Sequence, residues 1–212
     1  MRGTLITFEG VEGSGKTTLL KRLAHYLKEE KQVQVLTTRE PGGVPIAEEI
    51  RQLILNPAHT TMDGETEALL YAAARRQHLV EKVLPALKKG QFVLCDRFVD
   101  SSLAYQGYAR GIGLESIWQI NQFAIGGVLP DLTILLDVEP VLGLARIKAN
   151  EKREVNRLDL ENLEFHQRVY QGYKIVQKRF PERIVAVDAA RPVEQVFDQV
   201  RELVEQRFFG KK

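Results

Sequence analysis

The octapeptide Gly10-Val11-Glu12-Gly13-Ser14-Gly15-Lys16-Thr17 matches the pattern G-x-x-x-x-G-K-[ST] at every fixed position. A short apolar run at residues 5–8 favours a strand before it, and a helical pattern follows from Lys16 to about residue 30. Glycines permit backbone angles that let successive N–H groups surround a phosphate, and the start of a helix adds a positive dipole. We therefore expect a nucleoside triphosphate to bind along this loop and Thr18. Lys16 would reach the terminal phosphates, and the Thr17 hydroxyl would hold Mg²⁺.

Composition and charge are those of an ordinary globular protein. The chain has 212 residues, 44% of them hydrophobic and 27% charged, and its length suits one α/β domain over residues 1–212. The net charge of +2 argues against a general nucleic-acid binder. No apolar run approaches the roughly 20 residues that cross a bilayer, and no signal peptide is expected. The single cysteine, Cys95, agrees with a cytoplasmic location, and the scattered histidines lack zinc-ligand spacing.

Strand-like and helix-like segments alternate along the chain, which predicts a parallel sheet covered by helices. Segments 56–64 and 100–113 are expected to be loops, the second with some short helix. A helix should open at Pro45, and the helix over 66–88 should bend or restart at Pro85. Strands are expected at residues 5–8, 33–36, 92–96, 132–137 and 184–188, and further helices at 114–124, 141–150, 158–180 and 193–208.

Two acidic residues end predicted strands and compete for the role of metal ligand. Asp96 follows four apolar residues, and Asp137 ends a similar run. Ligands of open α/β sheets bind beyond the carboxyl ends of the strands, where an aspartate can hold Mg²⁺ directly or through water. We favour Asp96, because Arg97 beside it would place a cation next to the reacting phosphates.

Arginines are frequent in the loops predicted at the same end of the sheet, and on helices that enter them. Phosphoryl transfer needs cations around the migrating group, because little covalent chemistry is left for the protein to do. A solvated surface charge is the alternative for any single residue. The arginines concerned are Arg39, Arg51, Arg75, Arg97, Arg146, Arg153 and Arg157.

The use of the nucleotide is not settled by the phosphate loop. A guanine-nucleotide switch would need an Asn-Lys-x-Asp-like segment after a strand, and the chain has none. A P-loop ATPase that only hydrolyses or holds ATP stays open as an alternative. Such a protein would not need a second pocket for a small phosphorylated substrate.

Over almost its full length the sequence resembles the thymidylate kinases, which transfer a phosphate from ATP to dTMP. The segment FEGVEGSGKTT at residues 8–18 is shared with many nucleotide enzymes. The motifs that follow it are specific to the family in this order. They are TREPGG at 38–43, TEALLYAAARRQH at 66–78, DRFVDSSLAYQG at 96–107 and PDLT at 130–133.

The resemblance implies a pocket for dTMP. Tyr71 would place its ring against thymine, although a core tyrosine is the alternative from the residues alone. Arg75 and Gln106 would read the polar edge of the base, and an amide can donate and accept at once. By the same match Arg51 and Arg97 would hold the phosphate of dTMP, Glu40 and Ser102 would line the pocket, and Glu12 would face the deoxyribose hydroxyl.

One departure within the family concerns the catalytic cations. Some members carry an arginine in the phosphate loop where this chain has Gly13, and members without it carry catalytic cations in a lid. Residues 146–157 resemble such a lid, which would close over ATP and shed water. We expect Arg153 to reach the transferring phosphoryl group, with Arg146 and Arg157 behind it on ATP; a solvated basic helix end is the alternative for each.

Together these features predict a P-loop nucleoside monophosphate kinase fold, a five-stranded parallel sheet wrapped by helices with a short lid at about 146–157. The expected reaction is in-line transfer from ATP to dTMP, giving dTDP and ADP. Lys16, Asp96, Arg97 and Arg153 would be catalytic, and Mg²⁺ would be held by Thr17 and Asp96. A kinase for another nucleoside monophosphate is the nearer alternative. The resemblance also implies a homodimer, for which helix 68–74 and Trp118 are candidates, although a monomer's core would contain the same residues.

Overall fold

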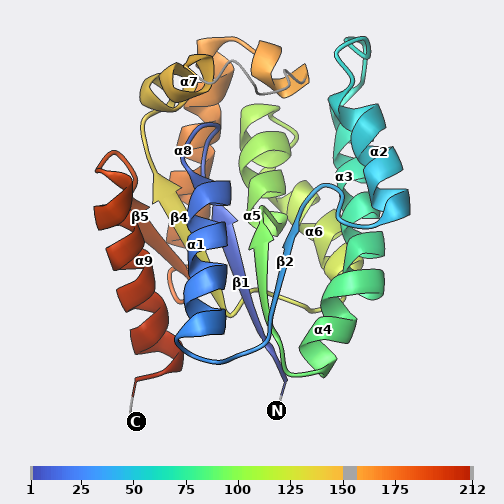
Figure 1. The fold of residues 1–212 in the computed structure, drawn as a ribbon. Helices are drawn as coiled ribbons and strands as arrows, with labels where there is room; N and C mark the ends of the chain where they lie inside the picture. The colour runs from blue at the N-terminus through green and yellow to red at the C-terminus, as the bar shows by residue number, and fades with distance from the viewer. Residues whose placement is uncertain (1, 150–156, 211–212) are drawn as a thin grey trace.

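A computed structural model describes residues 2–149 and 157–210. Five parallel strands form one sheet in the order β2-β3-β1-β4-β5 (Figure 1). The predicted five-stranded parallel sheet is therefore confirmed. The strands are β1 (Thr4–Glu9), β2 (Val35–Arg39), β3 (Phe92–Asp96), β4 (Leu132–Asp137) and β5 (Ile184–Asp188).

The helices begin and end largely where local sequence signals place them. Pro45 occupies the first turn of α2, and the Asp63 side chain caps α3 by accepting hydrogen bonds from two backbone N–H groups. The helices are α1 (Lys16–Glu29), α2 (Pro45–Leu55), α3 (Gly64–His78), α4 (Leu84–Lys88), α5 (Val99–Ser102), α6 (Leu114–Ile125), α7 (Pro140–Lys148), α8 (Leu163–Arg179) and α9 (Val193–Phe208). Two π-helical segments, η1 (Leu79–Val83) and η2 (Leu103–Ala109), and one 3₁₀ turn, η3 (Arg157–Leu160), complete the described elements.

Several predicted boundaries were wrong. The second strand begins and ends later, because β2 pairs with β3 in register from Val35 to Arg39. Segment 100–113, predicted as mostly loop with some short helix, is helical through α5 and η2, because its apolar residues are buried and it packs along α8. Helix α8 begins at Leu163, where the Asn162 side chain caps it. The predicted restart near Pro85 is confirmed, because α4 begins at Leu84 with Pro85 in its first turn, after the π-helical η1.

The two faces of the sheet pack against different helices. Alternate residues of β1, Ile6 and Phe8, share a core with Leu23 of α1 and with apolar residues of α9. Leu5, on the other face, packs in a second cluster with Leu79 of η1 and with residues of α4. Because helices cover both faces, the central strands β1, β3 and β4 are buried at nearly every position.

The carboxyl ends of the strands meet at the end of the sheet where α7 lies (Figure 1). The phosphate loop runs from β1 into α1 at this end, and its backbone at Gly13 and Gly15 has φ of 70° and 94°. A Cβ atom on Gly13 would lie 2.0 Å from the carbonyl oxygen of Gly143 in α7. The close approach of these two glycines leaves no room for a side chain at position 13.

Candidate active site

Lys16 lies inside the phosphate loop. Its Nζ donates hydrogen bonds to the carbonyl oxygens of Gly10 (3.0 Å) and Val11 (2.8 Å) and to the Ser14 hydroxyl (3.2 Å). Burial, reinforced by the positive charge of Arg97, lowers the pKa of Lys16 to about 8. The ammonium group is therefore held by carbonyl dipoles in a site that favours an anion as its partner.

Thr17 and Asp96 meet at the mouth of the loop. The Thr17 hydroxyl donates to the Asp96 carboxylate at 2.7 Å, which joins the first turn of α1 to the end of β3. A hydroxyl and a carboxylate are hard oxygen donors of the kind that Mg²⁺ prefers. The rival aspartate, Asp137, forms an ion pair with Lys174 at the end of β4.

Arg97 is held between the phosphate loop and α8. Its guanidinium donates to the Gly10 carbonyl (3.2 Å), the Tyr173 hydroxyl (3.0 Å) and the Glu12 carboxylate (2.9 Å). Its backbone φ of 68° lies in the left-handed region, which is unfavourable for arginine and is often found at functional sites. Although burial acts against ionisation, Arg97 and the nearby His166 hold the pKa of Glu12 well below its usual value.

A second cavity adjoins the phosphate loop. Every side chain predicted for the dTMP pocket lines it, together with Pro41, Leu55, Ser101, Tyr105 and Leu158. The predicted residues are Glu12, Glu40, Arg51, Tyr71, Arg75, Arg97, Ser102 and Gln106.

The two cavities share part of their lining. Glu12, Glu40, Arg51 and Arg97 line both this pocket and the cavity around Lys16. A group bound in one cavity therefore faces a group bound in the other across these side chains. Two of the four are arginines, so the junction carries the cations that phosphoryl transfer needs.

Arg75 is held by hydrogen bonds on one wall of the pocket. Its Nε donates to Glu40 (2.7 Å), its Nη1 to Ser102 (3.0 Å) and Asn121, and its Nη2 to the carbonyl oxygen of Phe98 (2.9 Å). A guanidinium carries five N–H groups. Among the described residues the second hydrogen on Nη2 has no acceptor, so one donor remains for a ligand.

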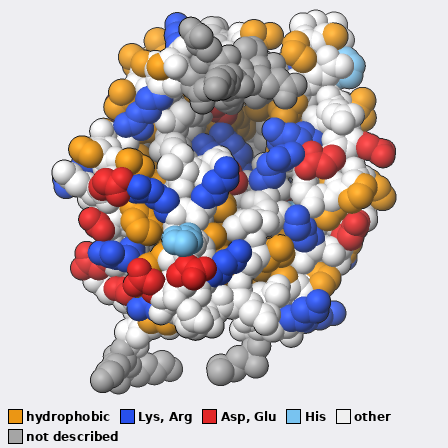
Figure 2. All heavy atoms as spheres, in the orientation of Figure 1, with side chains coloured by type: hydrophobic (Ala, Val, Ile, Leu, Met, Phe, Trp, Pro, Cys, Tyr) orange, Lys and Arg blue, Asp and Glu red, His pale blue; other side chains and the backbone are white. Residues whose placement is uncertain are grey.

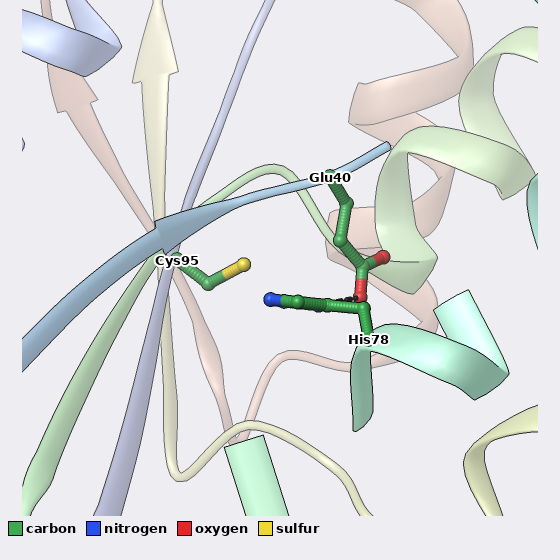
Figure 3. Close-up of side chains that lie close together, drawn as sticks. All are labelled: Glu40, His78 and Cys95. Carbon is green, nitrogen blue, oxygen red and sulfur yellow. Dashed lines mark hydrogen bonds and ion pairs between the residues drawn. The ribbon is translucent and has the colours of Figure 1, made fainter. Parts of the chain in front are cut away.

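Behind the pocket, the His78 ring lies between the Glu40 carboxylate and the Cys95 thiol (Figure 3). His78 Nδ1 is 2.9 Å from Glu40, so it donates to the carboxylate, and Nε2 is 2.7 Å from the Thr38 hydroxyl. Glu40, His78 and Cys95 are close enough to share a metal ion. Burial, with nearby carboxylates, raises the pKa of the Cys95 thiol well above its usual value, which disfavours metal binding. We interpret the cluster as an anchor for Glu40.

Cations surround the triphosphate cavity. Figure 2 shows Lys and Arg side chains around a hollow in the upper half of this face. The lining includes Lys16, Arg39, Arg51, Arg97 and Arg146. Two side chains predicted to bind the triphosphate, Thr17 and Thr18, also line it.

The candidate lid arginines have different positions. Arg146 lies on α7 and donates to the carbonyl oxygen of Ala189 at 3.0 Å. Arg157 is buried and donates to the carbonyl oxygen of Ile54 (2.8 Å) and to Glu67, away from Arg146. These contacts do not support the predicted binding of ATP by Arg157, which stays a prediction. Arg153 lies outside the described residues.

Several residues at the site were missed by sequence reasoning. The Tyr105 hydroxyl donates to the Glu12 carboxylate, and the Ser101 and Tyr173 hydroxyls both donate to Glu9. Burial and the nearby Asp100 raise the pKa of Glu9 to about 7. Glu9 ends an apolar strand as Asp96 does, so the same rule would have identified it. The tyrosines come from distant helices, and no local signal marks them.

A third cavity lies beside the phosphate loop and was also missed. Arg146 and residues 189–193, after β5, line it together with Gly13, Ser14, Gly15 and Thr18. The predicted strand end at Asp188 was the available signal, because ligands bind beyond such ends.

A phosphate loop with a hydroxyl–carboxylate pair, next to a second cation-lined pocket, defines a P-loop kinase of small phosphorylated substrates. The family model for thymidylate kinase matches residues 8–200. The chain belongs to the thymidylate kinase family. It is 61% identical over 197 residues to a thymidylate kinase of Geobacillus sp. (strain WCH70), covering 93% of each chain. It is 58% identical to a thymidylate kinase of Geobacillus thermodenitrificans, covering 100% of this chain and 94% of the relative.

A solved structure agrees with this family. The thymidylate kinase of Ehrlichia chaffeensis superposes with a TM-score of 0.79 at 34% identity, covering 96% of this chain and 100% of that chain. The predicted P-loop nucleoside monophosphate kinase fold is therefore confirmed. Within the described ranges, 2–149 and 157–210, no helix is long and apolar enough to cross a membrane.

Proposed function

We propose that this protein transfers the γ-phosphoryl group of ATP to dTMP, giving dTDP and ADP. The observation that carries the proposal is the pair of adjoining cavities that share Arg51 and Arg97. A nucleoside triphosphate on the loop and a monophosphate in the second pocket would meet at these arginines. Family membership and the side chains of the second pocket favour dTMP as the acceptor.

Positioning and charge stabilisation account for the transfer. Lys16 would leave its own loop carbonyls to contact the terminal phosphates of ATP. Arg97, already fixed by Glu12 and the Gly10 carbonyl, and Arg51 would hold the acceptor phosphate in line. A phosphate monoester is largely ionised near neutral pH, so the attacking oxygen needs no strong base.

Thr17 and Asp96 would hold Mg²⁺ at the mouth of the loop. Their hydroxyl and carboxylate oxygens suit a hard cation, and both side chains line the triphosphate cavity. The ion, when bound, neutralises charge that develops on the phosphate oxygens. Arg153 is proposed as a further cation on the transferring group, by the family resemblance alone.

The base of ATP would occupy the third cavity. It lies directly beside the phosphate loop, between Arg146 and the chain after β5. The planar guanidinium of Arg146, held by the Ala189 carbonyl, offers a face on which a purine can stack. On this assignment, Arg146 contacts the adenine base of ATP.

The decisive experiment measures ADP formation from ATP and Mg²⁺ with dTMP, dUMP, dCMP, dAMP, dGMP, UMP and AMP each supplied in turn. A strong preference for dTMP is expected. Preference for another monophosphate would overturn the assignment of the base pocket while leaving the phosphate loop unaffected. ADP formation that ignores every monophosphate would contradict the kinase assignment.

We also propose a homodimer in the cytoplasm, as the family resemblance implies. Trp118, one candidate for the interface, packs on Phe180 at 5.1 Å and is half-buried. Phe123 of α6 is 89% exposed and Leu69 of α3 is 56% exposed, and α3 packs against α6. These apolar side chains suit a subunit interface. Phe123→Asp should shift the mass measured by light scattering from dimer to monomer; an unchanged dimer would exclude this face.

A further inference from the structure

Glu67 is a buried carboxylate beside the base pocket. It is 1% exposed, and it lies one and two helical turns before Tyr71 and Arg75 on the same face of α3. Its Oε1 accepts a hydrogen bond from Nε2 of Gln106 at 2.7 Å. Such a buried acid needs partners that compensate its loss of hydration.

Two arginines supply that compensation. Arg157 donates to Oε2 of Glu67, and Arg110 approaches both oxygens at 3.3 and 3.4 Å. Although burial acts against ionisation, Arg110 and the hydrogen bond from Arg157 hold the pKa of Glu67 below its usual value. Glu67 is therefore ionised, and an ionised carboxylate only accepts hydrogen bonds.

This charge determines the orientation of the Gln106 amide. Only the NH₂ side of the amide can face an acceptor, so the oxygen side must face away from Glu67. Gln106 lines the base pocket and is 2% exposed, and no described residue donates to its Oε1. The amide oxygen is thus left as an acceptor for a ligand.

We propose that Glu67 is a specificity-determining positioning residue, which fixes Gln106 with its oxygen toward the base. The proposal rests on the proposed function and deepens it. Together with the remaining N–H on Nη2 of Arg75, the wall presents one acceptor and one donor. Thymine and uracil offer the matching N3–H donor and O4 acceptor. Cytosine offers the reverse, an N3 acceptor and an amino donor.

Glu67→Gln tests the proposal. Arg157 donates to the Oε2 position, so the new amide should place its oxygen there and its NH₂ group toward Gln106. Gln106 would then turn its own NH₂ group toward the base. We expect kcat/KM for dTMP and dUMP to fall about tenfold, through KM, while kcat/KM for dCMP rises and KM for ATP stays unchanged.

A double variant, Glu67→Gln/Gln106→Glu, provides the rescue. In this variant the amide stands at position 67 and the carboxylate at position 106. The amide donates to one oxygen of the carboxylate, and the other oxygen of the carboxylate accepts a hydrogen bond from N3–H of the base. Preference for dTMP over dCMP should return to within about threefold of the wild type. Arg110→Gln is the matched control: it removes an ion pair of Glu67 without touching the amide, and should leave the ratio of dTMP to dCMP within about twofold.

The outcomes distinguish a reversed orientation of the Gln106 amide from a general loss of activity or folding. A folded Glu67→Gln protein that loses activity equally with dTMP, dUMP and dCMP would overturn the proposal. If thermal melting shows that Glu67→Gln does not fold, the double variant carries the test, and a folded double variant without preference for dTMP overturns it. A wild-type enzyme that itself shows no preference for dTMP would instead contradict the proposed function.

Discussion

Binding of ATP should be linked to uptake of a proton by Lys16. Without a nucleotide, burial and Arg97 lower the pKa of Lys16 to about 8, and the carbonyl groups of its own loop do not fully compensate. A bound triphosphate surrounds the ammonium with negative charge and restores a pKa of about 10 or more. Above pH 8, Lys16 is therefore mostly deprotonated in the free protein, whereas it is protonated in the complex with ATP.

The size of the effect follows from these two pKa values. ATP binding should take up about half a proton at pH 8 and about 0.8 of a proton at pH 9, and affinity should fall about fivefold between these two pH values. Isothermal titration calorimetry in buffers of different ionisation enthalpy measures this uptake directly. Glu9, whose pKa is raised to about 7, is mostly ionised over this range and contributes little.

Lys16→Arg is the control, because arginine keeps its proton at these pH values. Any ATP binding by this variant should proceed without proton uptake at pH 9. A wild-type protein that takes up no more protons at pH 9 than at pH 8 would refute the depressed pKa. If the wild type and Lys16→Arg take up equal numbers of protons when ATP binds at pH 9, the proton binds to a group other than Lys16.

Three further changes test the geometry of the site. Asp96→Asn should lower kcat at least a hundredfold in steady-state assays with Mg²⁺ and leave the melting temperature nearly unchanged; near-normal kcat would exclude Asp96 as a metal ligand. Gly143→Ala places a Cβ 2.2 Å from the Glu12 carbonyl, so it should lower kcat/KM for ATP about tenfold and stability by about 1–3 kcal/mol; wild-type values for both would contradict this packing. His78→Leu should raise KM for dTMP several-fold and leave KM for ATP unchanged, whereas His78→Asn, which can still donate to Glu40, should be milder; equal effects would exclude the anchor.

Much of the fold could be predicted because its signals are local. The phosphate loop, the apolar strands β3, β4 and β5, and the opening of α2 at Pro45 each depend on residues adjacent in the sequence. The extent of the helix in segment 100–113 could not be predicted, because the segment's glycine and polar content favours a loop in isolation. It becomes helical where its apolar residues pack against α8, a helix that begins at Leu163.

The residues of the candidate site were likewise predictable from the sequence, whereas their side-chain partners were not. Every residue predicted for the dTMP pocket lines one cavity, because the motifs lie at strand ends and on one face of α3. The side-chain partners could not be predicted. Arg157 ends the predicted lid segment, yet it binds Glu67, ninety residues earlier in the sequence. Glu67 itself had a usable signal, since a spacing of four places it with Tyr71 and Arg75 on one helical face.

The sequence by itself determined that a triphosphate binds after the first strand, and that an acid and an arginine stand at the end of the third. Patterns of this kind need only the local geometry of strands, helices and glycine turns. The tertiary structure alone decided that Arg97 is held by Glu12 and that Gln106 is oriented by Glu67. Such contacts join residues far apart in the chain, and their geometry depends on how whole helices pack against the sheet.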